Sequence, residues 1–259
     1  MACELKPILV VLHQEHSTPG RVGQKLRALG YRLDIRKPRF GCPLPDTLDD
    51  HDGAIVFGGP MSAYDDEPFL KRECDWLDVP LREGAPFLGL CLGAQLLAQH
   101  LGARVAPDPQ GRVEVGYYPL EATVEGKRVM EWPKTVYQWH KDGFDLPAGA
   151  TRLATSSGAF PEQAFQVGPA AVGLQFHPEM TAAMIYKWTV KGSERLACPG
   201  AQSRREHLEG RFLYDPAMNA WLDRFLTVWL AGRRARLSGD SLGADRAVST
   251  DVTISTAAE

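Results

Sequence analysis

The sequence predicts an α/β fold with a mostly parallel central sheet, helices on both faces and a small region of antiparallel strands. Three observations indicate it. Short apolar runs rich in branched residues alternate with segments of helical spacing through residues 8–102. Glycines follow the ends of the helical segments, where they close helices readily. From residue 113 the pattern changes to alternating polar and apolar residues broken by Gly and Pro, which favours antiparallel strands.

The first part of the chain predicts strands and helices in alternation. The helix over 18–29 has apolar residues at Val22, Leu26 and Leu29 and is closed by Gly30. The other predictions follow the same reasoning, with strands over 8–12, 31–35, 53–57 and 86–90 and helices over 68–82 and 92–101.

The second part predicts short strands and then returns to helix. The strands are expected within 113–125, 129–136, 152–154, 164–167 and 171–176. Helical spacing resumes at Thr181, and residues 217–230 carry a broad apolar stripe. We expect a single domain over 1–233, followed by a flexible tail over 234–259 that is poor in large apolar residues.

Composition excludes several classes of function. The 29 basic and 32 acidic residues give a net charge of -3, so no nucleic-acid partner is expected. No apolar run approaches the roughly 20 residues of a membrane span, and the N-terminus lacks a signal-peptide pattern, so we expect a cytoplasmic protein with no membrane partner. The five cysteines form no C-x-x-C pair, which indicates neither a disulfide framework nor a metal site.

Cys91 lies in a nucleophile-elbow pattern. Residues 89–93 read Gly-Leu-Cys-Leu-Gly, between a predicted strand and a predicted helix. The tight turn needs small residues on either side, and the following helix N-terminus favours a thiolate. The alternative is a buried structural cysteine beside helix-packing glycines.

His177 and Glu179 follow the strand at 171–176, separated by Pro178. A thiol nucleophile needs a base that later protonates the leaving amine, and histidine does both near neutral pH. A carboxylate such as Glu179 can fix the tautomer of the imidazole. A His-Pro-Glu turn alone is weak evidence, because ordinary turns hold such residues.

Gly58 and Gly59 follow the strand at 53–57. Paired glycines let backbone N–H groups approach a substrate oxygen, as an oxyanion hole requires. The alternative is a loop that needs positive φ.

Taken together, these segments resemble the class I (triad) glutamine amidotransferases, and most of all a stand-alone branch akin to the glutaminase domain of GMP synthase. The resemblance covers residues 6–180 and rests on residues 58–66, 89–98 and 173–180, in the family's order. It implies a flavodoxin-like fold.

The resemblance also implies roles for individual residues. Cys91 would attack a γ-carboxamide carbon to give a γ-glutamyl thioester, with His177 moving the proton and Glu179 orienting it. The oxyanion would be held by Gly59 and Leu92. The substrate-binding residues would be Gly58, Gln95, Trp139, His140 and Lys141, with neither cofactor nor metal.

Some features depart from the family pattern. Relatives of this branch often show Gly-Asp after the histidine, where this chain has Lys141 and Asp142, so Lys141 either contacts a substrate carboxylate or points to solvent. His140 is interpreted as a pocket wall or structural residue in preference to a catalytic one. The charged segment 187–214 matches no family motif and is interpreted as solvated surface.

Three functions remain open at this point. One is a free-standing hydrolase of glutamine or γ-glutamyl amides, releasing glutamate and ammonia or an amine. Another is a glutaminase subunit that feeds ammonia to a separate synthetase, so that a synthetase or ligase would be its partner. A third is a catalytically silent regulatory protein on the same fold. The sequence leaves the oligomeric state open.

Overall fold

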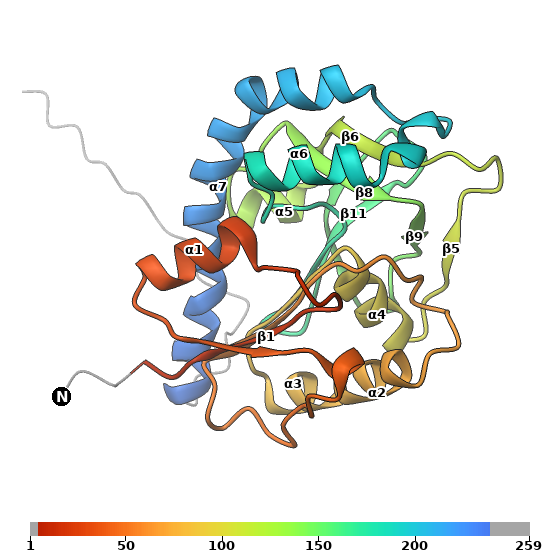
Figure 1. Ribbon diagram of the computed structural model, residues 1–259. Coiled ribbons are helices and arrows are strands. Elements are labelled where there is room, and N and C mark those ends of the chain that lie inside the picture. Colours follow the sequence, from red (N-terminus) through yellow and green to blue (C-terminus); the bar gives the residue numbers. More distant parts are fainter. Residues whose placement is uncertain (1–4, 239–259) are drawn as a thin grey trace, which may run out of the picture.

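An eight-stranded sheet forms the centre of the computed structural model, which describes residues 5–238, with the backbone alone for 232–238 (Figure 1). From one edge of the sheet to the other, the first five strands are parallel to their neighbours, and each of the last three is antiparallel to the strand before it. In spatial order the strands are β2 (Leu33–Arg36), β1 (Ile8–Val11), β3 (Gly53–Val56), β4 (Phe87–Leu90), β12 (Ala171–Leu174), β11 (Glu162–Val167), β10 (Thr151–Thr155) and β7 (Glu121–Ala122). The predicted fold class is confirmed.

Two small antiparallel sheets lie beyond the carboxyl ends of the parallel strands. One pairs β5 (Val105–Pro107) with β9 (Asp142–Phe144). The other pairs β6 (Glu114–Pro119) with β8 (Thr135–His140), so that Glu114 lies opposite His140. This pairing brings a predicted pocket residue next to a buried carboxylate.

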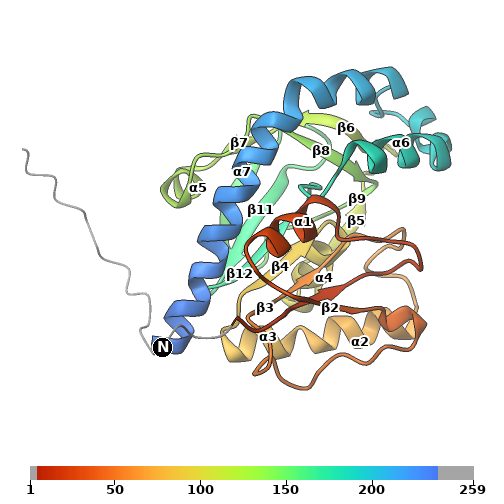
Figure 2. The same ribbon diagram turned by 60° about the vertical axis from the view of Figure 1, so that its left-hand side comes forward.

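Helices cover both faces of the large sheet, because its buried strands are apolar on both sides. In β1, Ile8 and Val10 pack in one core with α1 (Gly20–Ala28) and α7 (Arg204–Ser238). Leu9 and Val11 pack in a second core on the other face. The helices of that face are α2 (Pro68–Trp76), α3 (Asp78–Glu83) and α4 (Leu92–His100). In Figures 1 and 2, α7 and α2 lie on opposite sides of the sheet.

Four shorter elements complete the described chain. They are η1 (Pro38–Phe40), α5 (Val124–Val129), α6 (Ala182–Lys191) and η2 (Ser193–Ala197). A third apolar cluster packs β6 and β8 against α6, and it contains Tyr117, Tyr137 and Ile185. None of the helices in residues 5–238 combines the length and the apolar character needed to cross a bilayer.

The last helix corrects one boundary. The tail was expected from residue 234, but α7 continues through Ser238. Residues 233–237 are Arg-Arg-Ala-Arg-Leu, all good helix formers. The rest of the expected tail, 239–259, lies outside the described residues.

Candidate functional site

The candidate site lies where the parallel strands β3, β4 and β12 end. In such sheets, ligands bind beyond the carboxyl ends of the strands. Register aligns Leu90 of β4 with Leu174 of β12, so the residues that follow these two strands lie side by side. The backbone N–H of Cys91 donates to the Leu174 carbonyl at 2.8 Å, which joins the two strand ends.

Cys91 occupies a strained turn between β4 and α4. Its φ of 49° and ψ of -105° make it the sole non-glycine residue with positive φ in the described part of the chain. Small neighbours are required, because a Cβ on Gly89 would lie 2.5 Å from the Gly93 carbonyl oxygen and one on Gly93 would lie 2.1 Å from that of Val56. Strain of this kind is typical of a nucleophile elbow.

His177 and Glu179 form a buried pair beside Cys91. Nδ1 of His177 lies 2.7 Å from Oε1 of Glu179. A Cβ on Gly58 would touch both His177 Cε1, at 2.9 Å, and Cys91 Cβ, at 3.4 Å, so the imidazole and the thiol flank the same glycine. The Nε2 atom of His177 has no hydrogen-bond partner among the described residues, so it is free to exchange a proton with the thiol.

The surroundings favour a protonated His177. Burial alone lowers its pKa, but the carboxylate of Glu179 and the sulfur of Cys91 outweigh burial and raise the pKa to about 10. An imidazolium beside the sulfur stabilises a thiolate, which is the nucleophilic form of cysteine.

The loop after β3 is supported from behind by a buried histidine. Nδ1 of His13 lies 3.2 Å from the Gly58 carbonyl oxygen, and its Nε2 lies 2.7 Å from Oε2 of Glu73. A carbonyl only accepts, so Nδ1 carries a proton. Because C=O and N–H point in opposite directions across a trans peptide, the Gly59 N–H is turned away from His13. Gly59 lines the same pocket as Cys91.

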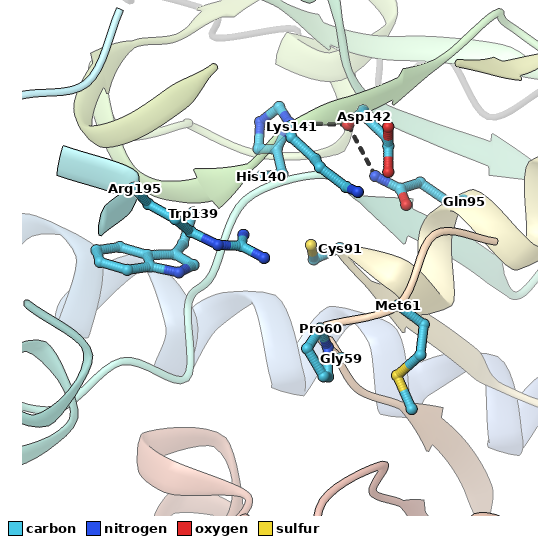
Figure 3. Close-up of a pocket in the computed structure, with 10 residues that line it drawn as sticks. All are labelled: Gly59, Pro60, Met61, Cys91, Gln95, Trp139, His140, Lys141, Asp142 and Arg195. Carbon is cyan, nitrogen blue, oxygen red and sulfur yellow. Dashed lines mark hydrogen bonds between the residues drawn. The ribbon is translucent and has the colours of Figure 1, made fainter. Parts of the chain in front are cut away.

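One wall of the pocket is built around Asp142 (Figure 3). Its carbonyl oxygen accepts from Nε2 of Gln95 at 2.8 Å and lies 2.9 Å from Nδ1 of His140. Its carboxylate accepts from Ser62 Oγ at 2.6 Å and from the Tyr64 hydroxyl at 3.0 Å. These bonds tie β9 to α4 and to the loop after β3, which fixes the shape of the wall.

Behind that wall, Glu114 fills a glycine-lined space. Its Oε2 accepts from Nε2 of Gln163 at 3.0 Å and lies 3.2 Å from Nε2 of His140, the latter outside hydrogen-bond alignment. A Cβ on Gly158 would overlap the carboxylate, at 2.1 Å from Oε1. His140 therefore sits between Glu114 and the Asp142 carbonyl as part of the wall.

The structure brings all of the sequence-predicted site residues to one place. Six of them line the pocket, namely Gly59, Cys91, Gln95, Trp139, His140 and Lys141. Gly58, Leu92, His177 and Glu179 lie directly behind these, in contact with them or next to them in the chain. The Lys141 side chain is exposed and points into the pocket mouth (Figure 3).

Sequence reasoning missed four contributors. His13 follows β1 and Glu73 lies in α2, and Asp142 was noted only for its position in the loop. Arg195 lines the pocket from η2, which corrects the interpretation of 187–214 as solvated surface, as does the buried His207. A histidine directly after an apolar strand is a signal that could have found His13; no pattern singles out Arg195.

Known proteins are similar to this chain in sequence. A family model described as glutamine amidotransferase class-I matches residues 11–184. The glutamine amidotransferase-like protein YfeJ of Salmonella typhimurium is 31% identical over 231 residues, covering 83% of this chain and 94% of that protein. The GMP synthase of Thermomicrobium roseum is 39% identical over 131 residues, covering 49% of this chain but 23% of that protein.

Solved structures give the same result. A glutamine amidotransferase from Methylobacillus flagellatus superposes with a TM-score of 0.81 at 28% identity, covering 88% of this chain and 96% of that one. One from Thermotoga maritima gives a TM-score of 0.79 at 31% identity, covering 88% and 99%. The chain belongs to the class I glutamine amidotransferase family.

Proposed function

We propose that this chain is a cysteine-dependent amidohydrolase that cleaves the γ-amide of glutamine or of γ-glutamyl conjugates through a γ-glutamyl thioester. The observation that carries the proposal is the strained Cys91 elbow flanked by the buried His177–Glu179 pair, in a pocket also lined by Gly59. A nucleophile, a base with its orienting carboxylate and an oxyanion donor then occupy one site.

Acylation uses these groups in order. The Cys91 thiolate attacks the γ-carbonyl carbon, and the carbonyl electrons move onto oxygen. The N–H groups of Gly59 and Leu92, the latter at the N-terminus of α4, stabilise that oxyanion. His177 gives its Nε2 proton to the amide nitrogen, the C–N bond breaks, and ammonia or an amine leaves.

Deacylation reverses the proton transfer. Neutral His177 takes a proton from water, which attacks the thioester carbon. The C–S bond breaks, glutamate forms, and the thiolate–imidazolium pair is restored. Glu179 keeps Nδ1 as the donor to its carboxylate throughout, so that Nε2 faces the reacting atoms.

The pocket wall suits the glutamyl head. The Gln95 amide, held by Asp142 and 3.2 Å from the Gln175 side-chain oxygen, offers a rigid polar group one helical turn from Cys91. The exposed ammonium of Lys141 points into the mouth and suits the α-carboxylate. We assign the acyl side of the substrate to these residues.

Ammonia delivery to a separate synthetase is the second candidate, because the chain is similar to part of a GMP synthase. The two candidates differ in the leaving group. A hydrolase of conjugates must accept a substituent on nitrogen, whereas an ammonia donor needs none.

Steady-state kinetics of the isolated chain separates the candidates. We expect turnover of at least one N-substituted γ-glutamyl amide, measured by release of free amine, without any added protein. Hydrolysis confined to glutamine and strongly raised by a synthetase would overturn the hydrolase and support the ammonia donor.

A further inference from the structure

Arg195 is a cation in the pocket for which the chemistry described above has no use. It lies in η2, is half-buried, and lines the same pocket as Cys91. Figure 3 shows its guanidinium pointing toward the space in front of Cys91. Within residues 5–231 it forms no ion pair with any carboxylate. A guanidinium without a partner, facing a substrate pocket, is suited to bind a carboxylate with two hydrogen bonds.

The position of Arg195 is on the leaving-group side of Cys91. The leaving nitrogen receives its proton from His177, so the leaving amine lies on the His177 side. The His177 ring packs edge-on against Trp188 at 5.2 Å, and Trp188 lies 5.6 Å from Trp139. The two indoles thus lead from His177 to Trp139, which lines the pocket together with Arg195. In Figure 3, Gln95 and Arg195 lie on opposite sides of Cys91.

The backbone around Arg195 is held against the same indole. A Cβ on Gly192 would lie 2.9 Å from Cζ2 of Trp139, so α6 ends in close contact with the ring. The N–H of Arg195 then donates to the Gly192 carbonyl at 3.1 Å. The backbone that carries the guanidinium is therefore fixed relative to the pocket.

We infer that Arg195 selects γ-glutamyl amides whose leaving amine carries a carboxylate, that is, γ-glutamyl amino acids and peptides. This inference rests on the proposed hydrolase function and narrows its substrate class. The acyl-side groups and Lys141 would hold the glutamyl head, and Arg195 would hold the carboxylate of the departing amino acid. Hydrolysis then yields glutamate and a free amino acid, with the proton on its nitrogen supplied by His177.

The test compares two substrates that differ in one charge, γ-glutamylglycine and γ-glutamylglycinamide. We expect kcat/KM of the wild type to favour γ-glutamylglycine, and Arg195→Gln to reduce that preference by roughly tenfold or more, the loss expected for a charged hydrogen bond. Arg195→Lys should retain part of the preference, because it keeps the charge but loses the fork. Arg205→Gln is the control, since Arg205 is 82% exposed and pairs with Glu209.

The outcomes are distinct. An unchanged preference in Arg195→Gln, or an equal loss on both substrates, would refute the role of Arg195 and leave the hydrolase standing. Turnover of glutamine with neither conjugate cleaved by the wild type would refute this inference and leave cleavage of the glutamine γ-amide standing. Absence of turnover on glutamine and on both conjugates would refute the proposed function itself. Thermal melting of each variant establishes that it is folded.

Discussion

At the scale of residues, the site depends on two buried histidine–carboxylate pairs with different tasks. His177 and Glu179 face the thiol, at 2.7 Å from each other. His13 and Glu73, also 2.7 Å apart, lie behind the Gly58–Gly59 peptide. In the proposed mechanism the first pair moves a proton, and we assign the second to holding the peptide that presents the Gly59 N–H.

The His13 assignment predicts a specific loss of oxyanion stabilisation. In Glu73→Gln the amide can donate to Nε2 of His13, so the proton stays on Nδ1 and activity should remain near wild type. Adding His13→Phe removes the donor to Gly58, and we expect kcat to fall about tenfold, less than the 10²–10³ for deleting an oxyanion donor.

Two measurements distinguish misalignment of the Gly59 N–H from general damage to the pocket. An aldehyde analogue of glutamate, which forms an oxyanion on Cys91, should bind the double variant more weakly than the single one. Alkylation of Cys91 by iodoacetamide forms no oxyanion and should keep its rate. Equal loss in both measurements would mean that the whole pocket is disturbed, against this account.

The pKa of His177 predicts an alkaline limb of activity. Because Glu179 and Cys91 raise that pKa to about 10, the imidazolium that protonates the leaving amine persists through neutral pH. We expect kcat/KM to fall as pH rises through about 10. Glu179→Gln removes one of the raising charges, so its limb should lie at lower pH; an unmoved limb would exclude Glu179 as the partner of His177.

The sequence predicted these residues to different extents. Cys91, His177, Glu179 and the glycines stand in compact motifs after strands, where spacing and chemistry coincide. Glu73 and Arg195 are charged residues within ordinary polar stretches, and their relation to the site depends on which elements meet in space. For Lys141 the sequence predicted a position at the pocket but left open whether the side chain contacts a substrate carboxylate or points to solvent.

At the scale of elements, close backbone contacts hold the site in register. The first residue of α1, Gly20, packs against the backbone of Glu179, and the next N–H, of Arg21, donates to the Glu179 carbonyl at 2.7 Å. A Cβ on Gly20 would lie 2.2 Å from that oxygen. Helix α1 thus positions the carboxylate that orients His177.

A pair of glycine variants tests this contact. Gly20 and Gly41 both have positive φ, 51° and 88°, but nothing lies within 4 Å of a Cβ on Gly41. Gly41→Ala should cost about 1–2 kcal/mol of unfolding free energy through left-handed strain alone. Gly20→Ala should cost about 1–3 kcal/mol more through overpacking, and it alone should lower turnover. Urea denaturation and kinetics measure both; equal behaviour of the two variants would contradict the contact.

The predicted boundaries of helices and strands were wrong where local sequence signals and tertiary packing conflict. The predicted helix over 68–82 is two helices, α2 and α3, divided at Leu77. The strand predicted through 125 gives way to α5, which Thr123 caps by accepting from the Gly126 N–H at 3.0 Å. The sequence predicted that the amphipathic helix starts at residue 217, directly after Pro216. In the structure α7 begins at Arg204 and contains Pro216, which lies near the bend of the helix visible in Figure 1.

At the scale of the whole molecule, the site lies between the large sheet and a cap. The cap contains β6, β8, α6 and the first part of α7, packed around aromatic side chains. His207 of α7 is fully buried there, with Nδ1 2.9 Å from the Tyr137 hydroxyl and its ring 5.7 Å from that of Trp139. The alternation of strands and helices predicted the sheet, but the cap consists of long-range pairs that no local pattern specifies.

His207 predicts a loss of stability in acid. Burial lowers its pKa from 6.5 to about 4, so the folded state binds this proton less readily than the unfolded state. Its contribution to stability is complete above pH 6.5 and is lost as pH falls toward about 4. The stability that His177 contributes is lost instead as pH rises from 6.5 toward about 10, because its pKa is raised.

The measurement is unfolding free energy by urea at a series of pH values. Wild type should lose stability below pH 6.5 more steeply than His207→Gln, which has no group to protonate there. Parallel pH profiles for the two proteins would contradict a neutral, buried His207.

The central claim is that Cys91 carries the γ-glutamyl group during turnover, and acid-quenched mass spectrometry tests it most directly. The isolated chain is mixed with a γ-glutamyl amide, quenched within the first turnover and analysed as intact protein and as peptides. We predict the added mass of one glutamyl group on the peptide that contains Cys91, and neither adduct nor amine release in Cys91→Ala. A glutamyl group found on Cys42, Cys74 or Cys198, or turnover that survives Cys91→Ala, would contradict the account.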